Sequence, residues 1–442
     1  MHLHYSHRLK IYEMRKALHV ITLLLGGIGL FLQGCEDQCQ RTVTYTRYEP
    51  IYMSYEELRS SVQSESPREL EQPGKIYFKT IYIFVSEVNE GIHVIDNSDP
   101  ANPQTISFIR VPGNRDIAVK GNILYADSYV DLVAIDISDP RNVSEVSRVE
   151  NTFPYFSSAS TMSWLGDPAE GVVRDWEERE VTETIDCSSS YGGGIWMAED
   201  LANGSGGGTF SPVTTGGGSE VSPGVGGSMA RFTIYQDFLY AISDQDMMLY
   251  NISNLESPSL SNTINIGWGI ETIFPYEDKL FIGSTTGMFI YDNSTPSNPT
   301  QLSQFAHVRS CDPVVVEGNT AYVTLRSGTP CEGFTNQLDV LDITDLTNPI
   351  LTATHQMTNP HGLGIDDGTL FICDGADGLK VYDANDPLTI SNNQLAHFAN
   401  INTYDVIPLN GLLFMIGPDG LYQYDYHDAN NISLLSKIPV IQ

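Results

Sequence analysis

The chain has 442 residues, with 55 acidic and 23 basic side chains and a formal net charge of −32. Such a field repels the phosphates of nucleic acid, so we expect no nucleic-acid partner. The negative charge is consistent with a solvated acidic surface, and it would also attract cations or a basic partner. The length exceeds that of an average domain, but large all-β domains reach this size.

The N-terminus carries an export signal. Arg15 and Lys16 precede the apolar run 20–32, which is too short to span a bilayer. This pattern predicts a signal peptide over residues 1–34. Met14 is a more usual start than Met1, so the true start codon stays open.

The segment that follows resembles a bacterial lipobox, with Cys35 directly after Leu32-Gln33-Gly34. The resemblance implies cleavage before Cys35 and lipidation of this residue. More than one acyl chain on the residue would anchor the protein stably in the membrane. The alternative is an ordinary signal peptide followed by a chance cysteine. Glu36 and Asp37 resemble an acidic signal for the outer face of the outer membrane, so we expect a lipid-anchored envelope protein that is surface-exposed.

Residues 35–74 are polar and charged, and we interpret them as lipid anchor and tether, with a short helix over 55–62. From residue 75 to 442 the organising feature is an internal repeat. Each unit holds an apolar strand, a second strand that ends in Asp or Asn, and a polar turn often closed by Pro. These turn positions are Asp96, Asp136, Asn251, Asp292, Asp342, Asp383 and Asp425.

The repeat period predicts the architecture. Most units are spaced by about 41 residues, which fits the four-stranded blade of a β-propeller, and seven units are present. We therefore predict an all-β, closed seven-bladed propeller. The orphan strand 75–80 is predicted to complete the last blade and so close the ring. The rival is an open array or a set of separate β-domains.

Two gaps in the repeat are longer than the period. The first holds an insertion over residues 155–228, and the second holds about nine extra residues that include Cys331. Insertions in repeat proteins fall in loops on one face, often the working face. The stretch 188–229 is rich in Gly and Ser, so we expect a mobile loop there.

Aromatic and acidic side chains mark the first part of the insertion. Trp164, Trp176, Glu177 and Glu178 form the best candidate for an interaction surface, because Trp anchors interfaces. The alternative is that the two Trp side chains only pin the insertion to the propeller.

Three hypotheses concern the cysteines. Cys311 and Cys331 flank one predicted strand pair, and export permits a disulfide between them. Cys373 lies in an apolar run and is expected to be a buried free thiol. Cys39 and Cys187 are a second candidate pair that would tie the tether to the insertion.

The second strands resemble those of bacterial LVIVD-repeat proteins, most closely at residues 132–136 and 338–342, while Asn251 departs from the pattern. The likeness covers about residues 75–440 without the insertion. It implies an exported β-propeller lipoprotein, and it supplies no catalytic residues.

No catalytic or metal motif stands out in the sequence. The repeated turns could suggest calcium ligands, but Asp and Ser at turns bond their own backbone, so we favour Asx turns. We therefore expect no cofactor, no metal and no catalytic residue. The favoured function is a monomeric binding or scaffolding module for a protein or glycan. The alternatives are an enzyme acting on a glycan or small substrate at the channel mouth, and a calcium-stabilised module.

Overall fold

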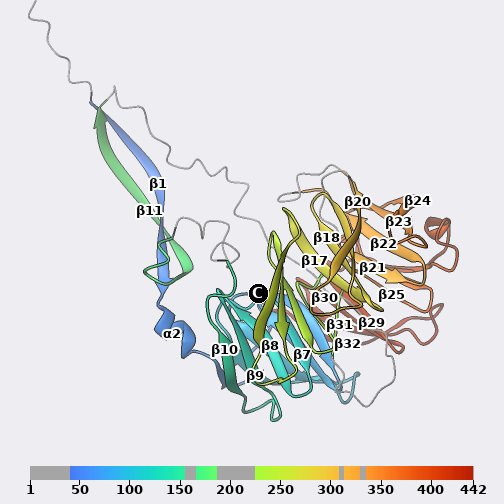
Figure 1. Cartoon of the computed structure of the whole chain (residues 1–442), viewed down its shortest axis with the longest axis horizontal. Coiled ribbons are helices and arrows are strands. Elements are labelled where there is room, and N and C mark those ends of the chain that lie inside the picture. The colour runs from blue at the N-terminus through green and yellow to red at the C-terminus, as the bar shows by residue number, and fades with distance from the viewer. Residues whose placement is uncertain (1–39, 155–165, 187–223, 308–312, 329–334, 442) are drawn as a thin grey trace, which may run out of the picture. The chain divides into compact units, whose positions relative to one another are not determined.

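The computed structural model describes residues 40–154, 166–186, 224–307, 313–328 and 335–441. Seven antiparallel sheets stand around a common centre (Figure 1). The prediction of an all-β propeller with seven blades is therefore confirmed. No helix among these residues is long and apolar enough to cross a membrane.

Each blade has four strands, named A to D from the centre outward, that follow one another in the chain. The blades comprise β3 (Pro73–Lys79), β4 (Tyr82–Glu87), β5 (Gly91–Asp96), β6 (Gln104–Arg110); β7 (Ile117–Lys120), β8 (Ile123–Ser128), β9 (Asp131–Asp136), β10 (Ser144–Val149); β13 (Phe232–Tyr235), β14 (Phe238–Ile242), β15 (Asp246–Asn251), β16 (Ser259–Asn265); β17 (Ile270–Tyr276), β18 (Lys279–Ser284), β19 (Gly287–Asp292), β20 (Thr300–Ala306); β21 (Val314–Glu317), β22 (Thr320–Leu325), β23 (Gln337–Asp342), β24 (Ile350–Gln356); β25 (Leu363–Asp366), β26 (Thr369–Cys373), β27 (Leu379–Asp383), β28 (Gln394–Phe398); and β29 (Asp405–Leu409), β30 (Leu412–Gly417), β31 (Gly420–Asp425), β32 (Ser433–Pro439). The short helix η4 (Ile390–Asn392) precedes β28.

Burial decreases from the centre outward. All four residues of the A strand β7 are buried, whereas the D strand β16 has no buried residue. Strands B and C carry apolar residues on both faces because each blade packs between two neighbours, as in β8 and β9. The core is therefore a ring of blade-to-blade contacts.

The boundaries of the predicted blades were wrong by one strand. If residues 75–80 completed the last blade as predicted, residues 116–119 would be the last strand of the first blade, but β7 begins the second blade and pairs with β8. The tight hairpin at Gly121, whose φ is +62°, forces these consecutive strands to pair. The longer link from β6 to β7 instead crosses to the next blade.

The same one-strand error makes the predicted ring closure wrong. Residues 75–80 do not complete the last blade, because β3 pairs with β4 in the first blade. The last blade has four strands of its own, β29 to β32, and β29 is its A strand. No blade shares a strand with the far end of the chain.

The ring closes through side-chain contacts between the first and last blades. The Phe78 and Phe414 rings stack with centroids 4.9 Å apart. The Gln423 amide donates a 2.7 Å hydrogen bond from Nε2 to Oδ1 of Asn97. These contacts occur inside the seam, so they hold the two blades together without strand exchange.

A segment before β3 also fastens this seam. β2 (Gln63–Glu65) pairs with β6 at the outer edge of the first blade. Leu70 then forms a parallel bridge with Val440, and the Ile441 N–H donates to the Leu70 carbonyl at 2.9 Å. The N-terminal segment does reach the last blade, but at Leu70.

A two-stranded ribbon connects tether and insertion, formed by β1 (Gln40–Met53) and β11 (Val172–Asp186). Thr44 Oγ1 lies 3.0 Å from Thr182 Oγ1, and Tyr48 bonds to Glu178, which fixes the antiparallel register. Residues 40–49 and 177–186 of the ribbon belong to a compact unit separate from the propeller. The tether was therefore predicted without its main strand.

The base of the ribbon, within the propeller unit, packs on the second blade. Met53, Leu58 and Val172 form an apolar cluster with Tyr129 and Val130. The helix α2 (Tyr55–Arg59) confirms the short helix expected in residues 55–62. Its start is capped by Ser54, which accepts from the N–H of the third helical residue.

The two faces of the propeller differ because strand direction alternates. A–B hairpins and C–D turns lie on one face, which we call the turn face. B–C hairpins and the links between blades lie on the other, which we call the insertion face. The long insertion between β10 and β13 and the extra residues between β22 and β23 both leave from the insertion face.

Candidate functional site

The turn face carries the seven repeat positions, and all seven do the same thing. In each, a side-chain oxygen accepts a hydrogen bond of 2.8–3.2 Å from the N–H two residues later. This confirms the Asx turns. The donors serving Asp96, Asp136, Asn251, Asp292, Asp342, Asp383 and Asp425 are Ser98, Ser138, Ser253, Ser294, Thr344, Asn385 and His427.

Bonding to the backbone N–H also explains the pKa of several of these carboxyls. The pKa of Asp96 is lowered by the N–H and hydroxyl of Ser98, and that of Asp383 by the N–H and amide of Asn385. The described residues contain no group of three or more His, Cys, Asp or Glu arranged to hold a metal ion. The repeated carboxyls therefore stabilise turns.

The central channel is filled by residues 224–230, which we call the plug. β12 (Val225–Gly226) pairs with β3 of the first blade. The Gly224 N–H donates to the carbonyl of Val119 in the second blade, at 2.9 Å, and the Ala230 carbonyl accepts from Ile273 N–H in the fourth, at 2.8 Å. The plug thus reaches the inner strands on several sides of the ring.

Ser228 ties the plug to two further blades. Its hydroxyl accepts from the Leu363 N–H at 2.9 Å and donates to Oδ1 of Asp405 at 3.3 Å. Our prediction of a mobile loop from 188 to 229 is therefore wrong for residues 224–229, since the hydrogen bonds that fix the plug outweigh the ordering entropy. Residues 188–223 of that prediction lie outside the described residues.

Buried charges hold the plug in place. Lys75 Nζ donates to the Met229 carbonyl at 2.7 Å and lies 3.9 Å from Asp116 Oδ2. Asp116 Oδ2 also accepts from the N–H of Arg231 at 2.5 Å. Burial lowers the pKa of Lys75 to about 8 and raises that of Asp405 to about 8, while each charge opposes the shift of the other.

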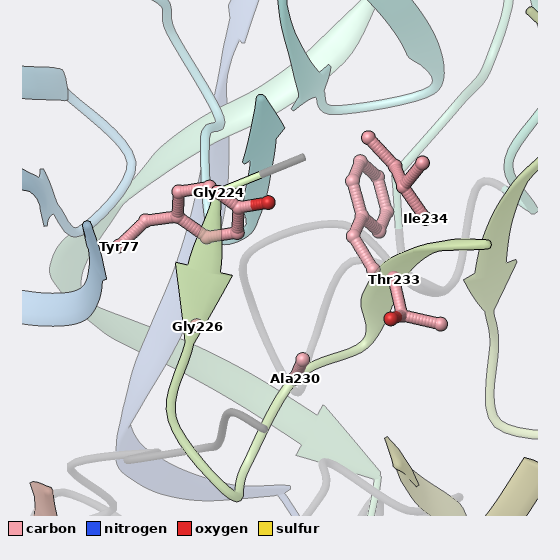
Figure 2. A pocket seen from close by; sticks show the side chains of 7 residues that line it. Tyr77, Gly224, Gly226, Ala230, Thr233 and Ile234 are labelled. Carbon is pink, nitrogen blue, oxygen red and sulfur yellow. The ribbon is translucent and has the colours of Figure 1, made fainter. Parts of the chain in front are cut away.

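One small cavity borders the plug. Figure 2 shows Tyr77 beside Gly224, with Ala230 and Thr233 further along the same segment. The cavity that they border has a volume of about 10 Å³, which is the size of a single water site. A substrate the size of a sugar has no room in it.

Ionisable side chains lie at strand ends on the insertion face in two groups, Arg115 with Arg231 and Arg326 with Glu271 and His361. Arg115 precedes β7, Arg231 precedes β13 and Glu271 lies in β17. Arg326 follows β22, and His361 precedes β25. We call these five residues the rim.

Burial shapes the electrostatics of the rim. It lowers the pKa of both Arg115 and Arg326. Burial, together with the neighbouring Arg326 guanidinium, lowers the pKa of His361 to about 3, so this imidazole is neutral at pH 7. Its Nδ1 is buried without a hydrogen-bond partner, and its Nε2 lies 3.2 Å from the Asn359 amide.

Trp268 stands out on the same face. It lies in the link between β16 and β17, and its side chain is 76% exposed. Our sequence reasoning singled out other Trp residues and missed this one. The available signal was the triplet Gly267-Trp268-Gly269, because two glycines around an aromatic residue indicate an unusual backbone that presents a side chain.

The other candidate residues are only partly described. Trp176 is half-buried in β11, and Glu177 and Glu178 beside it are exposed. Cys373 is buried and free, as expected. Cys35, Cys39, Cys187, Cys311, Cys331 and Trp164 lie outside the described residues.

Comparison with known families finds one repeat family that matches three stretches of the chain. The sequence profile of the LVIVD repeat matches residues 79–108, 113–151 and 309–356. The chain carries LVIVD repeats. The second and third matches each span a whole blade, β7–β10 and β21–β24, whereas the first covers β4, β5 and most of β6 but only the last residue of β3.

Solved structures similar to this LVIVD-repeat propeller are distant from it in sequence. A computationally designed protein, Ika8, has 10% identity and a TM-score of 0.49, covering 86% of this chain and 91% of its own. Hsv2 of Kluyveromyces lactis has 10% identity and a TM-score of 0.47, covering 84% and 100%. A functionally unknown protein from Desulfotomaculum acetoxidans has 11% identity and a TM-score of 0.44, covering 82% and 94%. No curated protein matches the chain.

Proposed function

We propose that this LVIVD-repeat propeller is an exported lipoprotein that binds a protein or glycan partner through its insertion face. The plug carries the proposal: with the channel interior filled, the exposed loops remain as the place for a partner. Six of the seven turns on the turn face have the same length, and the turn between β27 and β28 is only three residues longer and holds η4, whereas the two long departures from the repeat lie on the insertion face. Insertions of this kind usually form the working face of repeat proteins.

The test compares the two faces directly. A photo-crosslinking amino acid replaces the exposed Thr286, in a B–C hairpin of the insertion face, or the exposed Ser294, in a turn of the turn face. Both positions lie in the same blade, so the variants are matched for expression and folding. We expect adducts in intact cells from position 286 and none from 294. Adducts from 294 alone, or from neither, would overturn the proposal.

Anchoring at the outer membrane through Cys35 is the second part of the proposal. It is supported by the signal-peptide pattern and the lipobox resemblance. Cys35→Ser should move the protein from the membrane to the soluble fraction and abolish palmitate labelling. Cys373→Ala, which changes the buried thiol, is the matched control and should stay at the membrane. Unchanged fractionation of Cys35→Ser would refute the anchor.

We further propose that a Cys311–Cys331 disulfide stabilises the insertion face in the oxidising envelope. A closed loop of this length contributes about 3 kcal/mol by the chain-entropy account. Peptide mapping without reductant should recover the two cysteines in one linked peptide. Free thiols at both positions in protein isolated from the envelope would contradict the bridge.

A further inference from the structure

We propose that Trp268 is the anchor residue of the insertion face and that it receives a lysine or arginine side chain from a basic segment of a protein partner. This rests on the proposed function and adds the chemistry of the partner. Of the large apolar side chains in the described residues, Trp268 is the most exposed, at 76%, and Leu388 follows at 57%. Single exposed apolar residues are common on protein surfaces. Trp268 differs because the backbone on both sides of it is fixed by hydrogen bonds.

The loop around Trp268 is fixed by backbone hydrogen bonds on both sides. On the N-terminal side, the N–H groups of Ile266 and Gly267 donate to the Gln245 carbonyl at 2.9 and 3.2 Å. On the C-terminal side, the Ile270 N–H donates to the Asp244 carbonyl at 3.0 Å. The loop is therefore bound to the B–C hairpin of its own blade.

A fourth bond joins the loop to the next blade. The Gly269 carbonyl accepts from the Thr285 N–H at 2.8 Å. Gly269 has a φ of +74°, and a Cβ there would overlap the Thr285 hydroxyl, so only glycine fits. The backbone on both sides of Trp268 is thus fixed while its indole projects into solvent. Such preorganisation lowers the entropic cost of binding.

The surroundings of Trp268 favour a cation over an anion. Two carboxylates, Asp244 and Asp246, lie in the B–C hairpin to which the loop is bound. Glu271 follows Ile270, but its charge acts on the Arg326 guanidinium. Asp244 pairs with Arg231 at 3.0 Å, yet its side chain stays 62% exposed. Asp246 accepts from the Asn265 amide at 2.9 Å, which leaves its charge in place.

The whole chain adds to this local preference. With a net charge of −32, its field attracts a basic segment over a distance and speeds the encounter. Trp is the best aromatic acceptor of a Lys or Arg cation over its ring face. A neutral sugar ring could also lie on an exposed indole, but it gains nothing from this field.

The experiment uses the mature protein and a dye-labelled hexa-arginine peptide, with fluorescence anisotropy as the readout. We expect Trp268→Ala to weaken binding at least about tenfold and Trp268→Phe to restore part of it. Leu388→Ala, which removes the next most exposed apolar side chain and lies on the turn face, is the matched control and should bind like wild type. Because the Trp268 side chain is exposed, the melting temperature should stay unchanged in Trp268→Ala.

Equal binding of hexa-arginine by wild type and Trp268→Ala would overturn the proposal. So would Trp268-dependent binding of a neutral hexasaccharide, cellohexaose, without any for the peptide. In both cases the crosslinks from position 286 would still decide separately whether the insertion face binds a partner.

Discussion

Lys75 holds the plug against the buried carboxylates of the channel, and its replacement by Met tests that role. Met keeps a similar side-chain length but removes the cation and the donor to the Met229 carbonyl. The Lys75 and Asp116 side chains are only 7% and 2% exposed, so Asp116 would remain buried without its cation. Removing one partner of such a pair costs about 3–5 kcal/mol. We expect Lys75→Met to lose stability in that range.

The assay is urea unfolding at pH 7, followed by circular dichroism, for wild type, Lys75→Met, Asp116→Asn and the double variant. If the two groups compensate each other, the double variant should be less destabilised than the two single losses added together, by about 1–3 kcal/mol. A loss below about 1 kcal/mol for Lys75→Met, or strict additivity, would refute the reasoning.

Three further predictions concern other parts of the molecule. Burial raises the pKa of Asp405 to about 8, so between about pH 4 and 8 the folded state keeps a proton that the unfolded chain releases. This group's contribution to stability therefore falls as pH rises through that range. Asp405→Asn should flatten the fall in urea midpoints measured from pH 5 to 8, and equal slopes for variant and wild type would contradict the prediction. Asp136→Ala removes an Asx hydrogen bond of 2.8 Å and should lower the free energy of unfolding by about 1 kcal/mol. A chelator should leave the melting temperature of the wild type unchanged, and a fall on chelation would indicate a bound metal. Cys39 and Cys187 lie outside the described residues, and the disulfide between them that the sequence suggests stays a prediction. Mass mapping that finds both as free thiols in envelope protein would disprove the link.

The length of the repeat could be read from the sequence, but the strand at which each blade begins could not. Every blade contains one Asx turn of the same kind, such as that of Asp342, so counting these turns in the sequence gives the number of blades. The A strands, such as β7 and β29, are apolar runs that fit either end of a blade equally well. Only the pairing across the A–B hairpin decides between the two.

The plug escaped prediction because glycine has two uses. Residues 188–229 have the composition of a mobile loop, and the plug lies at its end. In the plug, Gly224 lets the backbone approach Tyr77 so closely that a Cβ would overlap the Tyr77 ring. The same residue type therefore signals mobility in the sequence and provides close packing in the channel.

The rim could not be recognised for a related reason. Arg115, Arg326 and His361 are far apart in the chain, and nothing in their neighbours distinguishes them from ordinary turn residues. Arg326 and His361 become neighbours only when the fifth and sixth blades pack together. Trp268 lies between two glycines in the sequence, but glycine is common in loops between strands, so this pattern alone does not single the residue out.

The contiguity of the blades has a consequence for how the molecule is made. As the chain emerges N-terminus first, each blade has all four of its strands before the next one begins. The seam must wait, because Leu70 pairs with Val440, which follows the last strand of the seventh blade. Assembly can therefore advance blade by blade, and the ring remains open until residue 440 has been synthesised.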